Sequence, residues 1–263
     1  MKRSTVDRSK LSPMMLQYME IKDKYDDTIV FFRLGDFYEM FFDDAVTASR
    51  ELELTLTGRD CGLDERAPMC GVPHHACDLY IKKLIEKGYM VAICEQTADP
   101  AECKGIVPRE VIRVVTPGTL IESSMLDETT NNYIASFFVQ AKESALCLAD
   151  ISTGEVHLFE FNGKDMSTSA INELSRFSPV EILINDAFLS KKDISTFIRE
   201  KLKASVQLLE ESDFSPLIHT DEVLKQFSVN SLKSLKIDEN SVSAFADLGF
   251  LLGTAKKGRN LSG

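Results

Sequence analysis

Apolar and polar residues follow one another along the first 60 residues in a pattern that predicts helices and strands in turn. Residues 13 to about 24 carry apolar side chains at helical spacing after a Ser-Pro pair that suits a helix start. The run from about Thr28 to Leu34 predicts a strand, Gly35-Asp36 a turn, and the run from Tyr38 to about Leu52 a second helix. This reading places Phe37 at a strand–turn–helix junction, which favours its exposure.

The same pattern continues to about residue 115 and predicts an α/β domain. It predicts a short strand from Leu54 to Thr57, a polar loop from Arg59 to Arg66 and a helix from Ala76 to Lys87. Two further strands are expected at Tyr89 to Cys94 and Val111 to Val115. Strands that alternate with amphipathic helices are typical of a sheet covered by helices.

A polar stretch from Thr119 to about Asn132 separates this domain from a second one and is interpreted as a linker. Beyond it the pattern predicts a three-stranded meander at Tyr133 to Val139, Ala145 to Ile151 and Val156 to Phe161, then a helix at about Ser167 to Phe177, a strand at Glu181 to Ile184 and a helix at about Lys192 to Leu202. This order of elements is ribonuclease-H-like.

Length and composition favour two ordinary globular domains without a membrane segment. The chain has 263 residues, of which 44% are hydrophobic and 27% charged. Apolar runs stay well short of the roughly 20 residues that cross a bilayer. The polar start Met1 to Thr5 lacks the apolar segment of a secretory signal. We therefore expect a cytoplasmic protein without membrane contact.

Six cysteines in a chain without a signal peptide are expected to be reduced thiols. The one group that could suggest a metal site is Cys61, Cys70, His74, His75 and Cys77. It lacks the paired C-x-x-C unit of zinc sites, so no metal ligand is predicted.

The heptapeptide Gly35 to Phe41 combines an aromatic ring at Phe37 with a carboxylate at Glu39. In an extended segment these two positions point the same way. A ring that enters between stacked bases would then lie beside a group able to hydrogen-bond the displaced base, which suits a test of the duplex for faults. The alternative is an aromatic-rich buried strand and helix, with Glu39 as a helix-start carboxylate.

Six strings of residues resemble the MutS family of DNA mismatch-repair proteins, in the family's order and at about its spacing. They are Ser12 to Tyr18, Phe32 to Glu39, Leu54 to Arg59, Pro68 to Ala76, Val91 to Gln96 and Val111 to Thr119. A weaker resemblance runs from Asn131 to about Asp247. The chain is identified as a member of this family, with a mixed-sheet mismatch-recognition domain at 10–117, a linker at 118–130 and a ribonuclease-H-like connector domain at 131–248.

The resemblance implies roles for particular residues. Phe37 would stack on a mispaired base from the minor groove, and Glu39 would hydrogen-bond that base. Arg59, the Pro68-Met69 loop and Arg109 would contact the DNA backbone and groove, which positions the duplex without reading its sequence. Mispaired bases are poorly stacked, so wedge insertion is expected to cost less there than at Watson–Crick pairs.

The resemblance also implies partners. Family members are homodimeric ATPases that use ATP and Mg²⁺, bind mismatched double-stranded DNA and contact MutL through the connector. This sequence contains no G-x-x-x-x-G-K-[ST] phosphate loop. We therefore expect no enzymatic activity, catalytic residue or cofactor in this chain itself.

The formal net charge of −11 argues against a stand-alone DNA binder. A local patch within a larger assembly remains compatible with it. Two alternatives stay open. One is a ribonuclease-H-like nuclease built on Asp150, with Asp186 and Asp193 as further carboxylates. The other is a purely structural protein-interaction module, which the acidic balance favours.

The last fifteen residues, 249–263, depart from the family. They contain four glycines, which is poor material for the long helix with which family members continue. We expect an atypical tail, such as a shifted reading frame would produce.

Overall fold

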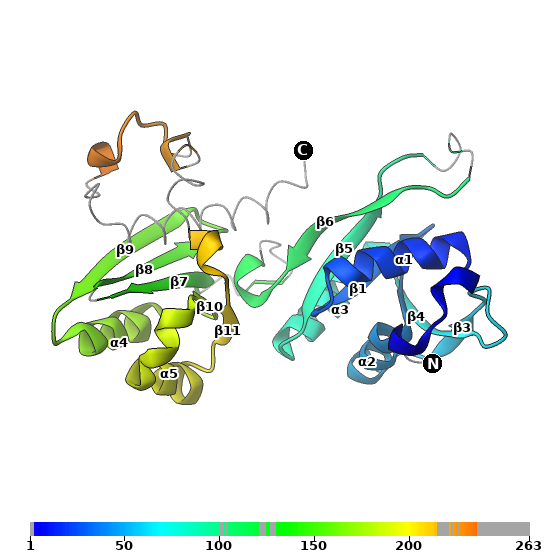
Figure 1. The fold of residues 1–263 in the computed structure, drawn as a ribbon, viewed down its shortest axis with the longest axis horizontal. Helices are drawn as coiled ribbons and strands as arrows, with labels where there is room; N and C mark the ends of the chain where they lie inside the picture. Colours follow the sequence, from blue (N-terminus) through cyan, green and yellow to red (C-terminus); the bar gives the residue numbers. More distant parts are fainter. Residues whose placement is uncertain are drawn as a thin grey trace. The chain divides into compact units, whose positions relative to one another are not determined.

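The computed structural model describes residues 3–99, 103, 105–120, 125–126, 130–141, 143–214, 221, 223–225 and 227–235. Two compact units divide the chain, Met1–Thr116 and Pro117–Gly263 (Figure 1). The linker expected at 118–130 is described only in part. Its first two residues, Gly118 and Thr119, are buried, and the amide of Gly118 donates to Glu181 of the second unit at 2.8 Å. The tail expected at 249–263 lies outside the described residues.

The described residues of the first unit form a mixed six-stranded sheet in the order β3-β4-β2-β1-β5-β6. Its strands are β1 (Thr28–Leu34), β2 (Phe37–Phe41), β3 (Thr57–Arg59), β4 (Ala67–Pro73), β5 (Met90–Gln96) and β6 (Arg109–Val115). Strands β1 and β5 run parallel, and the other neighbouring pairs are antiparallel. The mixed sheet confirms the predicted fold class of this domain.

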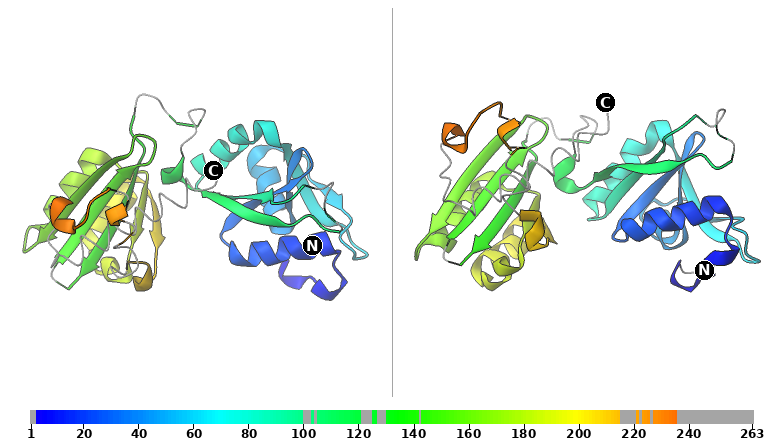
Figure 2. Two further views of the ribbon diagram at one scale, coloured as in Figure 1. Left: turned by 90° about the horizontal axis from the view of Figure 1, so that it is seen from above. Right: turned by 45° about the horizontal axis from the view of Figure 1, so that its top comes forward.

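Helices cover both faces of this sheet. They are α1 (Pro13–Lys24), α2 (Phe42–Leu52) and α3 (Cys77–Glu86). Figure 2 shows α1 on one side of the sheet and α2 with α3 on the other. Because both faces are covered, β1 is apolar on both: Val30 and Phe32 join the core beneath α1, and Ile29 and Phe31 are buried as well.

A buried ion pair joins α1, α2 and β1. The ammonium of Lys22 lies 2.9 Å from Asp44 Oδ1, and both side chains are only 7% exposed. Asp44 Oδ2 accepts from the hydroxyl of Tyr18 at 3.0 Å and from the amide of Val30 at 2.9 Å. The carboxylate of Asp44 is thus satisfied on both oxygens, as a buried charge requires.

The second unit has a five-stranded sheet among its described residues, in the order β11-β10-β7-β8-β9. Its strands are β7 (Tyr133–Gln140), β8 (Glu143–Asp150), β9 (Glu155–Asn162), β10 (Glu181–Ile184) and β11 (Ser205–Leu208), and its helices are α4 (Met166–Phe177) and α5 (Lys192–Phe197), the latter continued by a π-helical turn at Ile198–Leu202. Strand β10 is parallel to β7 and β11, and the meander β7-β8-β9 is antiparallel. Both helices pack on one face of the sheet (Figure 1). This is the predicted ribonuclease-H-like order, with β11 as a strand that the sequence pattern missed.

Short 3₁₀ turns complete the description. They lie at Arg3–Thr5, Arg8–Lys10, His74–Ala76, Pro117–Thr119, Asp186–Ser190, Glu211–Phe214 and Leu232–Leu235. None of the helices among the described residues has the length and apolar content that a bilayer crossing requires.

Two predictions are wrong in the segments that surround Phe37. The helix expected from Tyr38 begins only at Phe42, because Gly35 turns the chain with φ +56°, residues 37–39 pair with β1 as a hairpin strand, and residues 37–41 pair with β4. The Pro68-Met69 segment, expected to be a loop, belongs to β4. It is fixed there between β2 and β3, since Met69 pairs with Phe41 and Pro68 with Gly58.

None of the six cysteines is paired in a disulfide. Cys61, Cys70, Cys94 and Cys147 are buried. Burial raises the pKa of the Cys70 thiol, and likewise that of Cys94, to about 12. Within the described residues, no three His, Cys, Asp or Glu side chains are grouped as a metal site.

The Cys70 and Cys94 thiols are expected to weaken the fold at alkaline pH. An unfolded thiol titrates near pH 8.5, so above that pH the folded state binds more protons than the unfolded state, and the free energy of unfolding falls as pH rises. Between pH 8 and pH 10 we expect a loss of about 1 to 2 kcal/mol for each thiol. Urea unfolding at pH 8, 9 and 10 measures this loss. The double variant Cys70→Ala/Cys94→Ala should flatten the decline, whereas Cys103→Ala, which removes a thiol outside the buried set, should reproduce the wild-type slope.

Candidate nucleic-acid interface

Phe37 begins β2 directly after the two-residue turn Gly35-Asp36. It pairs with Leu34 on β1 and with Pro73 on β4, so its backbone lies between two strands. Its side chain is nevertheless 48% exposed. A large ring held on a fixed backbone and turned to solvent is suited to contact a partner rather than to fill the core.

Glu39 follows two residues later on the same strand, and therefore on the same face as Phe37. Its Oε2 lies 2.5 Å from Nη1 of Arg59 on β3, with 15% of the Glu39 side chain and 36% of the Arg59 side chain exposed. Its cross-strand partner on β4 is Gly71, where a Cβ would lie 3.4 Å from Glu39 Cγ. The missing side chain of Gly71 leaves room for the Glu39–Arg59 pair.

Pro68 and Met69 lie on β4, near its opposite end from Pro73, the partner of Phe37. Met69 stands four residues from Pro73, about 13 Å along a strand. The hydroxyl of Thr57 donates to the Met69 carbonyl at 3.1 Å, and both Pro68 and Met69 are half-buried. The structure thus brings Glu39, on the strand that carries Phe37, and Arg59 together across β4, and places Met69 further along the same face of the sheet.

Arg109 is buried, with only 8% of its surface exposed. Its Nε donates to the carbonyl of Arg33 at 2.7 Å, and its Nη1 donates to Gln17 Oε1 at 3.0 Å and to the carbonyl of Val107 at 2.9 Å. The guanidinium also lies 4.8 Å from the centre of the Phe32 ring. These contacts give Arg109 a role inside the unit, and they leave little of it for the DNA backbone contact expected from the sequence.

Glu95 on β5 was missed by the sequence reasoning. It accepts a hydrogen bond from the hydroxyl of Tyr38 and lies 3.5 Å from Nη1 of Arg33. The signal that could have identified it is a carboxylate in a strand that is otherwise buried, since a half-buried charge requires a partner.

Asp150 has no geometry for two-metal nuclease chemistry. Its Oδ1 accepts from Ser152 N at 2.9 Å and Ser152 Oγ at 2.6 Å, and its Oδ2 accepts from Asn132 N at 3.1 Å. Asp150 pairs with Tyr133 at one end of β7, whereas Asp186 follows β10 beyond Ile184, which pairs with Phe137. These carboxylates therefore lie toward opposite ends of the sheet, and the described residues give the nuclease alternative no support.

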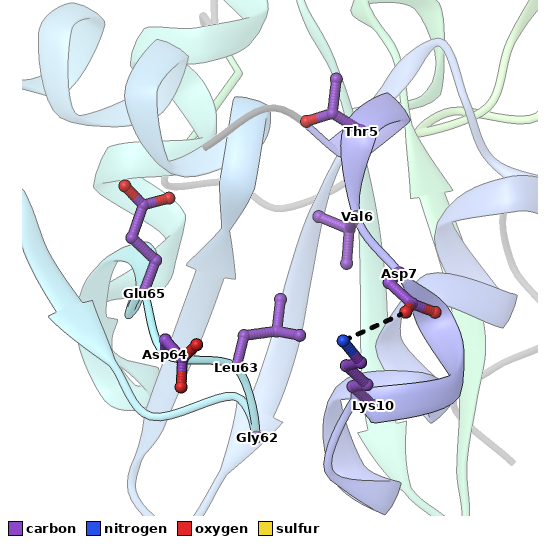
Figure 3. Close-up of a pocket in the computed structure, with 8 residues that line it drawn as sticks. All are labelled: Thr5, Val6, Asp7, Lys10, Gly62, Leu63, Asp64 and Glu65. Atoms are coloured by element: carbon purple, nitrogen blue, oxygen red, sulfur yellow. Dashed lines mark ion pairs between the residues drawn. The ribbon is translucent and has the colours of Figure 1, made fainter.

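A pocket of about 470 Å³ opens between the N-terminal arm and the loop before β4 (Figure 3). It is lined by Thr5, Val6, Asp7, Lys10, Gly62, Leu63, Asp64 and Glu65. Lys10 Nζ lies 3.7 Å from Asp7 Oδ2, which leaves two further carboxylates in the lining. Such a lining repels phosphate, so the pocket is not part of a DNA-binding surface.

Comparison with known proteins shows the family to which this chain is similar. The model of MutS domain I matches residues 12–124, and that of MutS domain II matches residues 132–256. The DNA mismatch repair protein MutS of Acetivibrio thermocellus is 47% identical over 239 residues, which is 89% of this chain and 26% of that protein. Those of Alkaliphilus oremlandii and Clostridium tetani are 48% and 52% identical, over 88% and 78% of this chain and 26% and 23% of each protein. The chain spans about a quarter of the length of these relatives.

A solved structure of Thermus thermophilus RuvC also aligns, at 10% identity and a TM-score of 0.34, over 47% of this chain and 95% of that chain. This score is too low to support an argument. The two α/β units instead follow the order of the two matched family models, and define a protein in which a mixed-sheet domain is followed by a ribonuclease-H-like domain. The chain belongs to the MutS family and corresponds to its domains I and II.

Proposed function

We propose that the first unit recognises mispaired bases in double-stranded DNA and thereby serves DNA mismatch repair. The observation that carries the proposal is the exposed ring of Phe37 on a fixed hairpin turn, beside Glu39. In this proposal Phe37 enters from the minor groove and stacks on a mispaired base. Wedge insertion costs a few kcal/mol of unstacking per step. A mispaired base is already poorly stacked, so the cost is lower there and binding favours the fault.

Glu39 acts on the displaced base in this proposal. An ionised carboxylate accepts from an imino N–H, and a protonated one donates to a ring nitrogen. The ion pair with Arg59 supports this role, because it offsets the repulsion between Glu39 and the DNA phosphates. A partly exposed pair is worth only about 0 to 1 kcal/mol, so it can open when DNA offers Arg59 a phosphate and Glu39 a base.

The remaining roles, except that of Arg109, follow family membership. Pro68 and Met69 contact the groove, whereas Arg109 supports the hairpin from inside the unit through its bond to the carbonyl of Arg33. The second unit connects recognition to the ATPase core and provides the surface for MutL, within a homodimer in the cytoplasm. ATP and Mg²⁺ bind that core, outside domains I and II, and this chain contributes no catalytic residue.

A salt series of DNA binding tests the proposal. The chain would be joined to the remaining domains of the Acetivibrio thermocellus relative, and the dissociation constants of a G·T heteroduplex and its G·C homoduplex would be measured together. Phosphate contacts weaken as salt rises. We therefore expect preference for the heteroduplex to persist or grow with salt. Equal affinity at every salt concentration would refute the proposal and favour a protein-interaction module.

Glu39→Gln is expected to tighten homoduplex binding about fivefold, because a like charge 4 Å away costs about 1 kcal/mol in water. Heteroduplex binding should be retained, because the amide still offers the displaced base an acceptor and a donor. Titrations of both duplexes measure these changes. Glu51→Gln is the matched control, because Glu51 also pairs with cations, Arg50 at 2.9 Å and Lys87 at 3.1 Å. Equal effects of the two variants would show that only net charge matters.

A further inference from the structure

Four side chains, from four strands that are neighbours in the sheet, lie around the hairpin turn that carries Phe37. We call Tyr38 on β2, Arg33 on β1, Glu95 on β5 and Arg109 on β6 the turn network. Their strands are neighbours in the order β2-β1-β5-β6. The network therefore crosses most of the sheet to reach one turn.

The turn network holds the backbone of β1 and the turn from both faces of the sheet. On one face, Arg33 Nε donates to the carbonyl of Gly35 at 2.5 Å, and its guanidinium lies 5.6 Å from the centre of the Tyr38 ring. Glu95 accepts from Tyr38 and approaches Arg33. Arg109 packs against Phe32 from the other face and donates a hydrogen bond to the carbonyl of Arg33.

These contacts fix the residues on both sides of Phe37. Gly35 is held by Arg33, the carbonyl of Asp36 accepts from the amide of His74 at 2.9 Å, and Tyr38 is held by Glu95. Tyr38 is buried, and burial, with the hydrogen bond to Glu95, raises its pKa, so its hydroxyl keeps the proton it donates. A ring that must unstack bases needs its backbone held in this way, because a side chain displaced by about 1 Å loses the interaction for which it is positioned.

We infer that Glu95, Arg33 and Tyr38 are positioning residues for mismatch recognition, which hold Phe37 at the height and angle needed to enter a faulty base step. The inference rests on the proposed function. It assigns Arg33 to holding the turn that carries Phe37 rather than to a phosphate contact. A rigid turn also lowers the conformational entropy that is lost on DNA binding, since the turn already has its bound conformation.

Two matched pairs of variants test the inference in the joined protein described above. Tyr38→Phe removes the hydroxyl that reaches Glu95, and Tyr89→Phe removes a hydroxyl that donates to Glu51 at 3.2 Å in the same unit. Arg33→Gln and Arg50→Gln each remove one positive charge, with only Arg33 bound to the turn. The measurements are heteroduplex and homoduplex affinities and the fluorescence of 2-aminopurine placed beside the mispair, which rises when the neighbouring base is unstacked.

Tyr38→Phe and Arg33→Gln should each lower the heteroduplex preference about threefold to tenfold, the effect of one lost hydrogen bond, and reduce the 2-aminopurine signal. Homoduplex affinity should stay within about twofold of wild type. The Tyr89 and Arg50 variants should keep the wild-type preference. If wild type discriminates and both turn variants discriminate equally well, the inference is overturned while the proposed function stands. Equal loss of affinity for both duplexes also overturns it, because that is the effect of general destabilisation. If wild type shows no preference, the proposed function fails first.

Discussion

Replacing Phe37 by alanine is expected to lower the preference for a heteroduplex by about fivefold to 150-fold, because stacking of an aromatic side chain on a base is worth about 1 to 3 kcal/mol. Homoduplex affinity should change far less, since it depends on phosphate contacts that the substitution leaves in place. The fold should survive, because the ring is 48% exposed and its truncation opens no large cavity in the core. The loss is therefore expected in discrimination rather than in stability.

Competition titrations of G·T and G·C duplexes at two salt concentrations measure this effect. Leu79→Ala is the matched control, because Leu79 is an apolar side chain on α3 of the same unit and is 63% exposed. It should leave the preference unchanged. A Phe37→Ala protein that keeps the full preference for the heteroduplex would show that Phe37 does not act by stacking on a mispaired base. Phe37→Tyr, which retains the ring, should retain most of the preference and would separate stacking from side-chain volume.

The sequence was a good guide where one local pattern had one structural solution. The strand Glu181–Ile184 has the predicted bounds, and the other predicted strands of the second unit agree to within one or two residues. The segment after Gly35 had two solutions. Its apolar run fits a buried strand and a helix equally well over four or five residues. Pairing with β1 and β4 decided for the strand up to Phe41, and a single sequence does not show this pairing.

The site divides in the same way. Phe37 and Glu39 could be singled out because their chemistry lies within three residues and within a string that resembles the family. Glu95 and Arg109 could not be placed, because their roles depend on partners 57 and 76 residues away, Tyr38 and Arg33. The sequence pattern of an arginine in a strand is the same whether its side chain faces solvent or donates a hydrogen bond to a buried carbonyl. Only the order of β1, β5 and β6 in the sheet shows that Arg109 reaches the hairpin from inside.

The largest loss of stability is expected from Asp44→Asn. The substitution removes the countercharge of Lys22, whose ammonium is almost fully buried and lies 2.9 Å from Asp44 Oδ1. Removing one member of a buried pair costs about 3 to 5 kcal/mol, because the other charge remains desolvated. The hydroxyl of Tyr18 and the amide of Val30 also lose a charged acceptor. Since domains are only marginally stable, this loss would leave a large fraction of the first unit unfolded at 37 °C.

Urea unfolding, followed by the fluorescence of the tyrosines, measures this loss. Asp43→Asn is the matched control: Asp43 is the preceding carboxylate on α2, is exposed, and accepts from the amide of Arg3 at 3.0 Å. It should cost less than about 1 kcal/mol. The double variant Lys22→Met/Asp44→Asn should recover part of the lost stability, because no buried charge is then left without a partner. A double variant as unstable as Asp44→Asn alone would mean that the bonds from Tyr18 and Val30, which join α1 and β1 to α2, matter more than the charge of Lys22.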